Sequence, residues 1–174
     1  MKKTVGYTIV EMMIVVVVIG ILAAITTVSY RYVQDRAKAA ALADGAKAVE
    51  DAFRMFTTKN GHATWPIDDP LTGTNNSTIN EIIAATNLKN YLKSAPVISS
   101  MPTTTWTYDN DGDARLPTAC DTSWSGVNLV MSNVPDSVAK ELDRSIDDGN
   151  TSCGRVRKAN ANVVMYQLSF DMNF

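Results

Sequence analysis

The hydrophobic pattern of the chain is dominated by an unbroken apolar run near the N-terminus. Between Met12 and Ile25 only Gly20 falls outside the hydrophobic class, and no charged residue occurs from Met12 to Tyr30. As an α-helix, residues 12–30 would be about 28 Å long, close to the roughly 30 Å of a bilayer's hydrocarbon core. A helix that is apolar on every side can also be a buried core helix, but a chain of 174 residues hardly supplies the protein needed around it. The pattern therefore predicts a transmembrane helix.

From Arg31 onwards the pattern becomes amphipathic, with apolar residues returning every three or four positions. The predicted apolar face consists of Tyr30, Val33, Ala37, Ala41, Gly45, Val49, Phe53 and Phe56. The predicted polar face consists of Arg31, Gln34, Asp35, Lys38, Asp44, Lys47, Glu50 and Arg54. One helix is therefore expected from Thr8 to Lys59, where Asn60-Gly61 is a typical C-terminal cap. At about 78 Å, this helix would be far longer than a compact domain of this size requires.

The rest of the chain, residues 61–174, is predicted to form a small α+β head. Thr78 and Glu81 form a capping-box pair that opens a short helix to about Lys93, and a second short helix is expected over residues 135–146. Three stretches of alternating apolar residues predict strands near residues 104–108, 127–131 and 164–170. Strands joined by such short excursions favour an antiparallel sheet, and we expect the long helix to pack on it.

Composition narrows the functional classes. The chain has 16 Lys and Arg against 18 Asp and Glu, a net charge of −2, which gives no general attraction to nucleic acid, so DNA is not indicated as a partner. A single histidine, His62, and two cysteines cannot form a four-ligand zinc site. Because His62 has no evident Ser or Cys partner, no nucleophile–base pair is recognisable, and we expect a protein that is not an enzyme.

One carboxylate, Glu11, stands at the edge of the apolar run with apolar residues on both sides. An ionisable group in a membrane-spanning segment is costly and usually has a function. The alternative is a carboxylate that is favoured by the helix N-terminus and reaches the lipid headgroups. Lys2 and Lys3 precede it and favour retention of the N-terminus in the cytoplasm, which would place the bulk of the chain outside.

The N-terminus resembles the class III signal of type IV pilins and of the pseudopilins of type II secretion. In that family a short basic leader ends in Gly, and an aromatic residue, Thr, an aliphatic residue, any residue and Glu follow. The corresponding residues here are Lys2, Lys3, Gly6, Tyr7, Thr8, Ile9 and Glu11. The resemblance implies that prepilin peptidase removes the leader, residues 1–6, by cutting between Gly6 and Tyr7, and then N-methylates Tyr7. It also implies the pilin fold, with residues 7–60 as the long helix.

Removal of the leader would create an α-amino group on Tyr7, about one helical turn from Glu11. The Glu11 carboxylate could pair with the amino group of its own chain or with that of a neighbouring subunit. The resemblance favours the second role, in which Glu11 sets the axial register of a filament. Because a buried charge without a partner costs several kcal/mol, such pairing would discriminate strongly between registers.

Two features of the head are less specific. Cys120 and Cys153 could be unrelated thiols, but a location outside the cytoplasm favours a disulfide, and many type IV pilins carry one near the C-terminus. Acidic clusters at residues 109–113 and 143–150 contain the oxygen ligands that calcium prefers, although clusters of Asp, Asn and Gly are more often turns. We expect no metal and no other cofactor. Were calcium to bind, the ligands would be Asp143, Asp147, Asp148 and Asn150.

These features together predict a structural subunit of a type IV pilus (fimbrium), polymerised through its N-terminal helix. The expected partners are further copies of the chain, prepilin peptidase, the assembly platform with its ATPase, and the lipid bilayer before assembly. The expected location is a single pass through the cytoplasmic (inner) membrane with the head outside the cytoplasm, followed by an extracellular pilus or a periplasmic pseudopilus. A pseudopilin of a type II secretion or DNA-uptake system is an alternative, as is a membrane-anchored binding protein that never polymerises.

Overall fold

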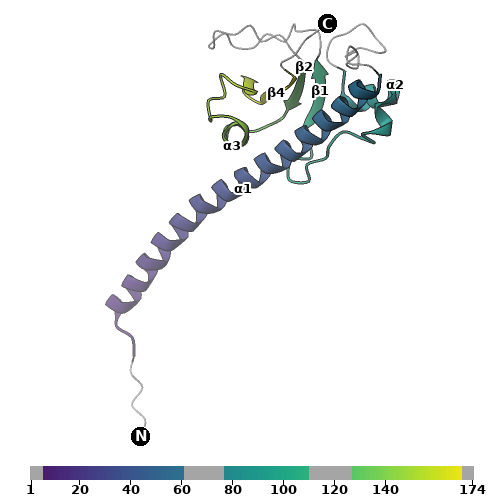
Figure 1. Cartoon of the computed structure of the whole chain (residues 1–174). Helices are drawn as coiled ribbons and strands as arrows, with labels where there is room; N and C mark the ends of the chain where they lie inside the picture. The colour runs from purple at the N-terminus through teal and green to yellow at the C-terminus, as the bar shows by residue number, and fades with distance from the viewer. Residues whose placement is uncertain (1–5, 61–76, 110–126, 170–174) are drawn as a thin grey trace. The chain divides into compact units, whose positions relative to one another are not determined.

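The computed structural model of the chain describes residues 6–60, 77–109 and 127–169 (Figure 1). The chain divides into two compact units, residues 1–35 and 36–174. One helix, α1 (Ile9–Asn60), contributes its N-terminal part to the first unit and its C-terminal part to the second. The bounds of α1 agree within one residue with the helix predicted from Thr8 to Lys59, so the predicted long helix is confirmed.

The first unit contains the N-terminal part of α1. All side chains of residues 6–34 are exposed in it. This part of the helix is long and apolar enough to cross a membrane, and none of its apolar window is buried inside the protein. An apolar surface of this size needs lipid or protein to cover it.

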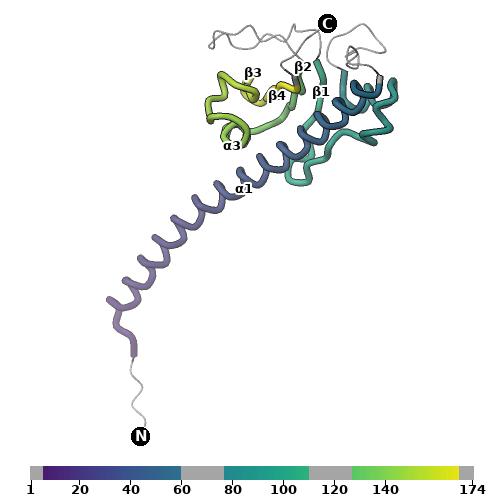
Figure 2. Tube along the Cα trace, in the orientation of Figure 1, coloured from purple at the N-terminus to yellow at the C-terminus, as the bar shows by residue number. Residues whose placement is uncertain are grey.

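The second unit is built on a four-stranded antiparallel sheet with the strand order β1-β2-β4-β3. Its strands are β1 (Thr105–Asp109), β2 (Val127–Ser132), β3 (Val156–Asn160) and β4 (Val163–Ser169). Three strands fall on predicted stretches, and the predicted α+β class is confirmed. The sequence pattern does not predict β3, which lies beside β4 at an edge of the sheet (Figure 2). Its second and third residues, Arg157 and Lys158, are charged, as is common on edge strands, and interrupt the apolar alternation.

The short helices are α2 (Ile79–Ala85), the 3₁₀-helix η1 (Asn87–Asn90) and α3 (Asp136–Ile146). The capping box predicted at Thr78 and Glu81 is present, and α3 lies where a helix is predicted. However, α2 ends well before Lys93, so the predicted length was wrong. The cause is Thr86, whose hydroxyl donates to the Ile82 carbonyl at 2.7 Å and accepts from the Leu88 N–H at 3.1 Å, which ends one helix and starts the next.

The core of the second unit lies between the sheet and the C-terminal part of α1. The buried apolar residues of α1 are Ala39, Leu42, Ala46, Val49, Ala52 and Phe53. The Phe53 ring lies 4.7 Å from that of Tyr108 on β1. The predicted apolar face was wrong at its start, because Ala37 is exposed whereas Leu42 and Ala46 are fully buried. The helical spacing tolerates either stripe, and contact with the sheet selects the one that contains Leu42.

The prediction that Glu50 lies on the polar face of the helix was also wrong, because Glu50 is only 8% exposed. Its carboxylate pairs with Arg54 at 2.7 Å and with Arg155 at 3.3 Å. It also accepts a hydrogen bond from the Tyr166 hydroxyl at 2.7 Å. These partners supply the donors that a buried carboxylate needs, and they come mainly from residues far away in the sequence.

Candidate functional site

The first turn of α1 is closed by a capping box between Thr8 and Glu11. The Thr8 N–H and the Thr8 hydroxyl each donate to Glu11 Oε2 at 2.8 Å, and the Glu11 N–H donates back to Thr8 Oγ1 at 3.2 Å. The box satisfies backbone donors that the start of a helix otherwise leaves open. Sequence reasoning overlooked this role of Thr8, although the Thr-x-x-Glu signal is the same as the one at residues 78–81.

The second capping box provides an internal comparison. At α2, the Thr78 N–H and hydroxyl each donate to Glu81 Oε2 at 2.7 Å, and the Glu81 N–H donates to Thr78 Oγ1 at 3.3 Å. The boxes at Thr8 and at Thr78 therefore have nearly the same geometry in two different surroundings. The Thr8–Glu11 arrangement is thus a property of the local sequence and needs no tertiary support.

The box leaves one oxygen of Glu11 open. Both Thr8 donors go to Oε2, and no described residue donates to Oε1. The carboxylate is also exposed, as are all residues from 6 to 34. Glu11 can therefore accept a further cationic donor, such as an α-amino group, without first giving up its bonds to Thr8.

The predicted cleavage site, Gly6-Tyr7, lies just before α1 in a segment that is neither helix nor strand. Tyr7 is 81% exposed. A Cβ atom added to Gly6 would meet no atom within 4 Å, so the fold of this chain makes no steric demand for glycine at this position. A requirement for Gly6 would have to come from another molecule, as expected if a peptidase must bind the backbone here.

The predicted disulfide can be followed only at one end. Cys153 lies in the loop between α3 and β3, where its N–H donates to the Asn150 carbonyl at 2.9 Å. No cysteine is free in the described part of the chain. Cys120 lies outside the described residues, so the Cys120–Cys153 pairing stays a prediction.

Three of the four residues named for calcium serve the α3–β3 loop itself. Asp147 Oδ2 accepts hydrogen bonds from the N–H groups of Arg155 at 2.5 Å and Val156 at 3.0 Å. Asp148 accepts from the Asn150 N–H at 2.8 Å, and the Asn150 side chain accepts in turn from Ser152 at 3.2 Å. Within residues 6–60, 77–109 and 127–169, no three His, Cys, Asp or Glu side chains are grouped to hold a metal. Of the first acidic cluster, residues 110–113 lie outside the described residues.

The fourth residue, Asp143, is fully buried in the last turns of α3. Neither of its carboxylate oxygens makes a hydrogen bond of good geometry within the described residues. Burial, together with the negative charges of Asp147 and Asp148, raises the pKa of Asp143 to about 6, while the Gly149 N–H acts in the opposite direction. The Asp143 carboxyl group therefore binds a proton more tightly than an ordinary carboxyl group. Because folding buries this group, its protonation affects the stability of the folded chain.

Comparison with known proteins identifies the N-terminal segment. Residues 1–27 match the model of the prokaryotic N-terminal methylation motif, the signal cut and methylated by prepilin peptidase. No curated protein and no solved structure matches the chain. The matched segment contains Gly6, Tyr7, the Thr8–Glu11 box and the first part of the long apolar helix α1, and a four-stranded antiparallel sheet comes later in the chain. The chain therefore carries the class III prepilin signal of the type IV pilins and pseudopilins on an α+β, pilin-like architecture.

Proposed function

We propose that the chain is a structural, non-enzymatic subunit of a type IV pilus-like filament, cut by prepilin peptidase and polymerised through the N-terminal part of α1. One observation carries the proposal: the methylation motif contains the start of α1, and every residue of this helix is exposed from Ile9 to residue 34. Before assembly, lipid would cover this surface, and in a filament the same helix of neighbouring copies would cover it.

In this proposal Glu11 selects the register between subunits. Cutting after Gly6 creates an α-amino group on Tyr7, and Glu11 Oε1 is open to receive such a group from a neighbouring copy. Thr8 keeps the other oxygen bonded throughout, at 2.8 Å from two donors. Because an ionised group in a membrane is costly without donors, Thr8 lowers the cost of holding Glu11 before a neighbour arrives.

The proposed location follows from the same segment. Lys2 and Lys3 favour retention of the N-terminus in the cytoplasm, so the second unit would lie outside the cytoplasm. A disulfide between Cys120 and Cys153 would be stable in such an oxidising compartment. The partners would be prepilin peptidase, an assembly platform with its ATPase and further copies of the chain.

Pilins and pseudopilins share the motif, and the cysteine pair favours a pilus subunit over a secretion or DNA-uptake pseudopilin. The effect of deleting the chain distinguishes a pilin from a pseudopilin. Loss of sheared surface filaments that contain this chain is expected for a pilin. Loss of secretion or of DNA uptake with no surface filament would instead indicate a pseudopilin.

The decisive experiment is mass spectrometry of the N-terminus of the chain, purified from the membranes of cells that contain prepilin peptidase. We expect N-methyl-Tyr7 as the first residue. An intact Met1, or a cut after Ala24 as in an ordinary secretory signal, would overturn the proposal.

A further inference from the structure

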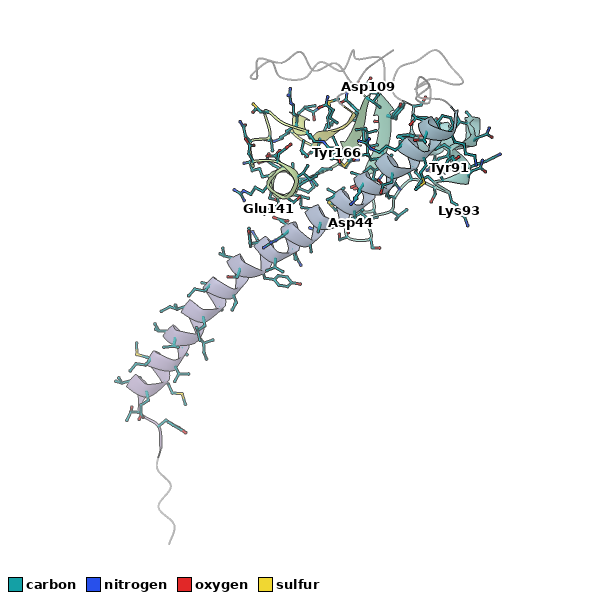
Figure 3. All side chains as sticks on the ribbon, in the orientation of Figure 1. Asp44, Tyr91, Lys93, Asp109, Glu141 and Tyr166 are labelled. Atoms are coloured by element: carbon teal, nitrogen blue, oxygen red, sulfur yellow. The ribbon has the colours of Figure 1, made fainter. Side chains whose placement is uncertain are left out.

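Two hollows lie along the C-terminal part of α1, within the second unit. The acidic hollow, with a volume of about 550 Å³, is lined by Ala41, Asp44, Gly45, Pro96, Val97, Ile98, Ser99 and Ser100. The basic hollow, with a volume of about 540 Å³, is lined by Arg54, Met55, Thr58, Lys59 and Tyr91. Asp44 and Tyr91, one from each hollow, are labelled in Figure 3. The lining of the first includes one acid and no base, and the lining of the second includes two bases and no acid.

The same two hollows contain the large exposed apolar side chains of the described part of the second unit. Among the described residues after 35, only Met55 and Val97 are large apolar residues that are exposed, by 57% and 81%. Met55 lies in the basic hollow and Val97 in the acidic one. A single exposed apolar side chain is ordinary on a protein surface, but a hollow that combines one with an unscreened charge can supply both the apolar centre and the polar rim of a protein interface.

The acidic hollow is built before any partner arrives. One wall of this hollow is the loop of residues 95–100. The Ala95 N–H donates to the Asn80 side chain at 2.8 Å and holds the start of this loop in place. A Cβ atom at Gly45 would lie 3.0 Å from the Trp106 ring and 3.1 Å from Pro96, so the loop and the strand can approach α1 this closely only at a glycine. The loop that carries Val97 is therefore packed against α1 and is not a free segment.

The charges of both hollows are open to a partner. Neither Asp44 nor Lys59 has an ion-pair partner among the residues that the structure describes. Arg54 is bonded to Glu50, but 57% of its side chain remains exposed. The two surfaces are therefore complementary in charge, and each also offers one apolar side chain.

Within one chain the two hollows cannot meet. Asp44 and Lys59 are separated by about 22 Å along the axis of the same helix. A contact between an acidic and a basic hollow therefore needs two copies, and it joins two different surfaces. A head-to-tail contact of this kind repeats without closing and produces a filament when the rotation does not form a ring.

We propose that the acidic hollow of one copy docks on the basic hollow of the next, with Asp44 facing Lys59 and Val97 covering Met55. The inference rests on the proposed function, since it names the surfaces through which the heads of one filament meet. It predicts an offset of about 22 Å, measured along α1, between the two copies that make this contact.

Charge reversal tests the contact in the full chain. Asp44→Lys and Lys59→Glu are each expected to lower the yield of sheared filaments about fivefold or more, and the double variant to restore it, because the reversed charges then face one another again. Lys47→Glu and Asp51→Lys are matched controls, since both residues are exposed on α1 and line neither hollow. Yields that are unchanged in both single variants, or that fall further in the double variant, would overturn the inference.

Cysteine cross-linking tests the same contact without a change in charge balance. Disulfides form only between residues whose Cα atoms lie within about 7 Å, so Asp44→Cys with Lys59→Cys cannot bridge within one chain. Oxidised filaments of this double variant should give a ladder of covalent oligomers, which neither single variant gives. Filaments without a ladder would overturn the inference and leave the proposed function standing. If the unaltered chain forms no filament in cells with the full assembly machinery, both fail.

Discussion

Tyr166 on β4, which is labelled in Figure 3, donates its hydroxyl hydrogen to Glu50 on α1 at 2.7 Å, although 116 positions separate the two residues. Burial of the Glu50 carboxyl group alone would raise its pKa. Hydrogen bonds from Tyr166 and Arg54 and the charges of Arg155 and Arg54 outweigh burial, so the pKa of Glu50 is lowered. For Tyr166, burial and the bonded Glu50 carboxylate raise the pKa of the phenol above its usual range. The hydrogen bond between the ionised Glu50 carboxylate and the protonated Tyr166 hydroxyl therefore joins the long helix to the sheet.

The first prediction concerns this pair. Tyr166→Phe should lower the free energy of unfolding of the second unit by about 1–2 kcal/mol, because a buried carboxylate loses one donor. Chemical denaturation of the full chain in detergent would measure it, and Tyr91→Phe is the control, since no hydrogen bond of its hydroxyl joins it to the described residues. Equal stability of the Tyr166→Phe variant and the unaltered chain would show that the arginines alone suffice for Glu50.

The second prediction concerns pH. The pKa of Asp143 is about 6 in the folded chain against an ordinary value of 3.8, so the folded state binds the proton more tightly. The resulting stability is fully present below pH 3.8 and is lost as the pH rises through 6, by about 3 kcal/mol at most. Asp143→Asn removes the titrating carboxyl group, so the variant should not lose this stability as the pH rises.

Unfolding measured at pH 5 and at pH 7.5 isolates the effect, because the carboxyl groups of the second unit with lowered pKa, Glu50, Glu81 and Asp136, stay ionised at both values. The difference in stability between the unaltered chain and the Asn variant should change between the two pH values. A constant difference would show that Asp143 does not titrate in this range.

The third prediction concerns Glu11. Glu11→Ala should leave insertion into the membrane intact, since the apolar helix is unchanged, and should abolish filaments, since no carboxylate remains to pair with the amino group of Tyr7. Membrane fractionation and shearing of surface filaments provide the two measurements. Normal filaments from this variant would refute the pairing role.

The fourth prediction separates Thr8 from Glu11. Thr8→Val removes the hydroxyl that both donates to Glu11 and caps the helix, which should cost about 1 kcal/mol of helix stability at the N-terminus and reduce filament yield partially. Thr8→Ser keeps the hydroxyl and should behave like the unaltered chain. If the Val and Ser variants assemble equally well, the capping box has no part in assembly.

The fifth prediction concerns processing. Gly6→Phe should block removal of the leader while the chain still folds, because a side chain at this position meets no atom of the chain within 4 Å. The mass of the membrane-bound chain measures the result. Efficient removal of residues 1–6 from this variant would argue against a cut that requires glycine.

Local patterns in the sequence were sufficient for several features. The apolar run of residues 12–30, the bounds of α1 and the capping box at Thr78 depend on neighbours within one or two helical turns, which the sequence displays directly. The leader and Glu11 were recognisable for the same reason, since the signal is a short linear segment read by another protein. Thr8 was equally predictable from its spacing to Glu11.

Other features depend on residues that meet only in the folded chain. The amphipathic part of α1 has two alternative stripes of apolar residues at helical spacing. Packing on the sheet buries the stripe that contains Leu42 and Ala46. The burial of Glu50 depends on its partners Tyr166 and Arg155. The edge strand β3 depends on its backbone pairing with β4.

The long apolar helix, its signal and the helix caps can thus be predicted from the amino-acid sequence, because these rest on contacts along one segment. Folding of the whole chain selects which face of α1 is buried, which charges are paired and where the two hollows lie. The reason is physical: a contact across more than a hundred residues leaves no periodic trace in either segment, since each side is selected by the shape and charge of the other.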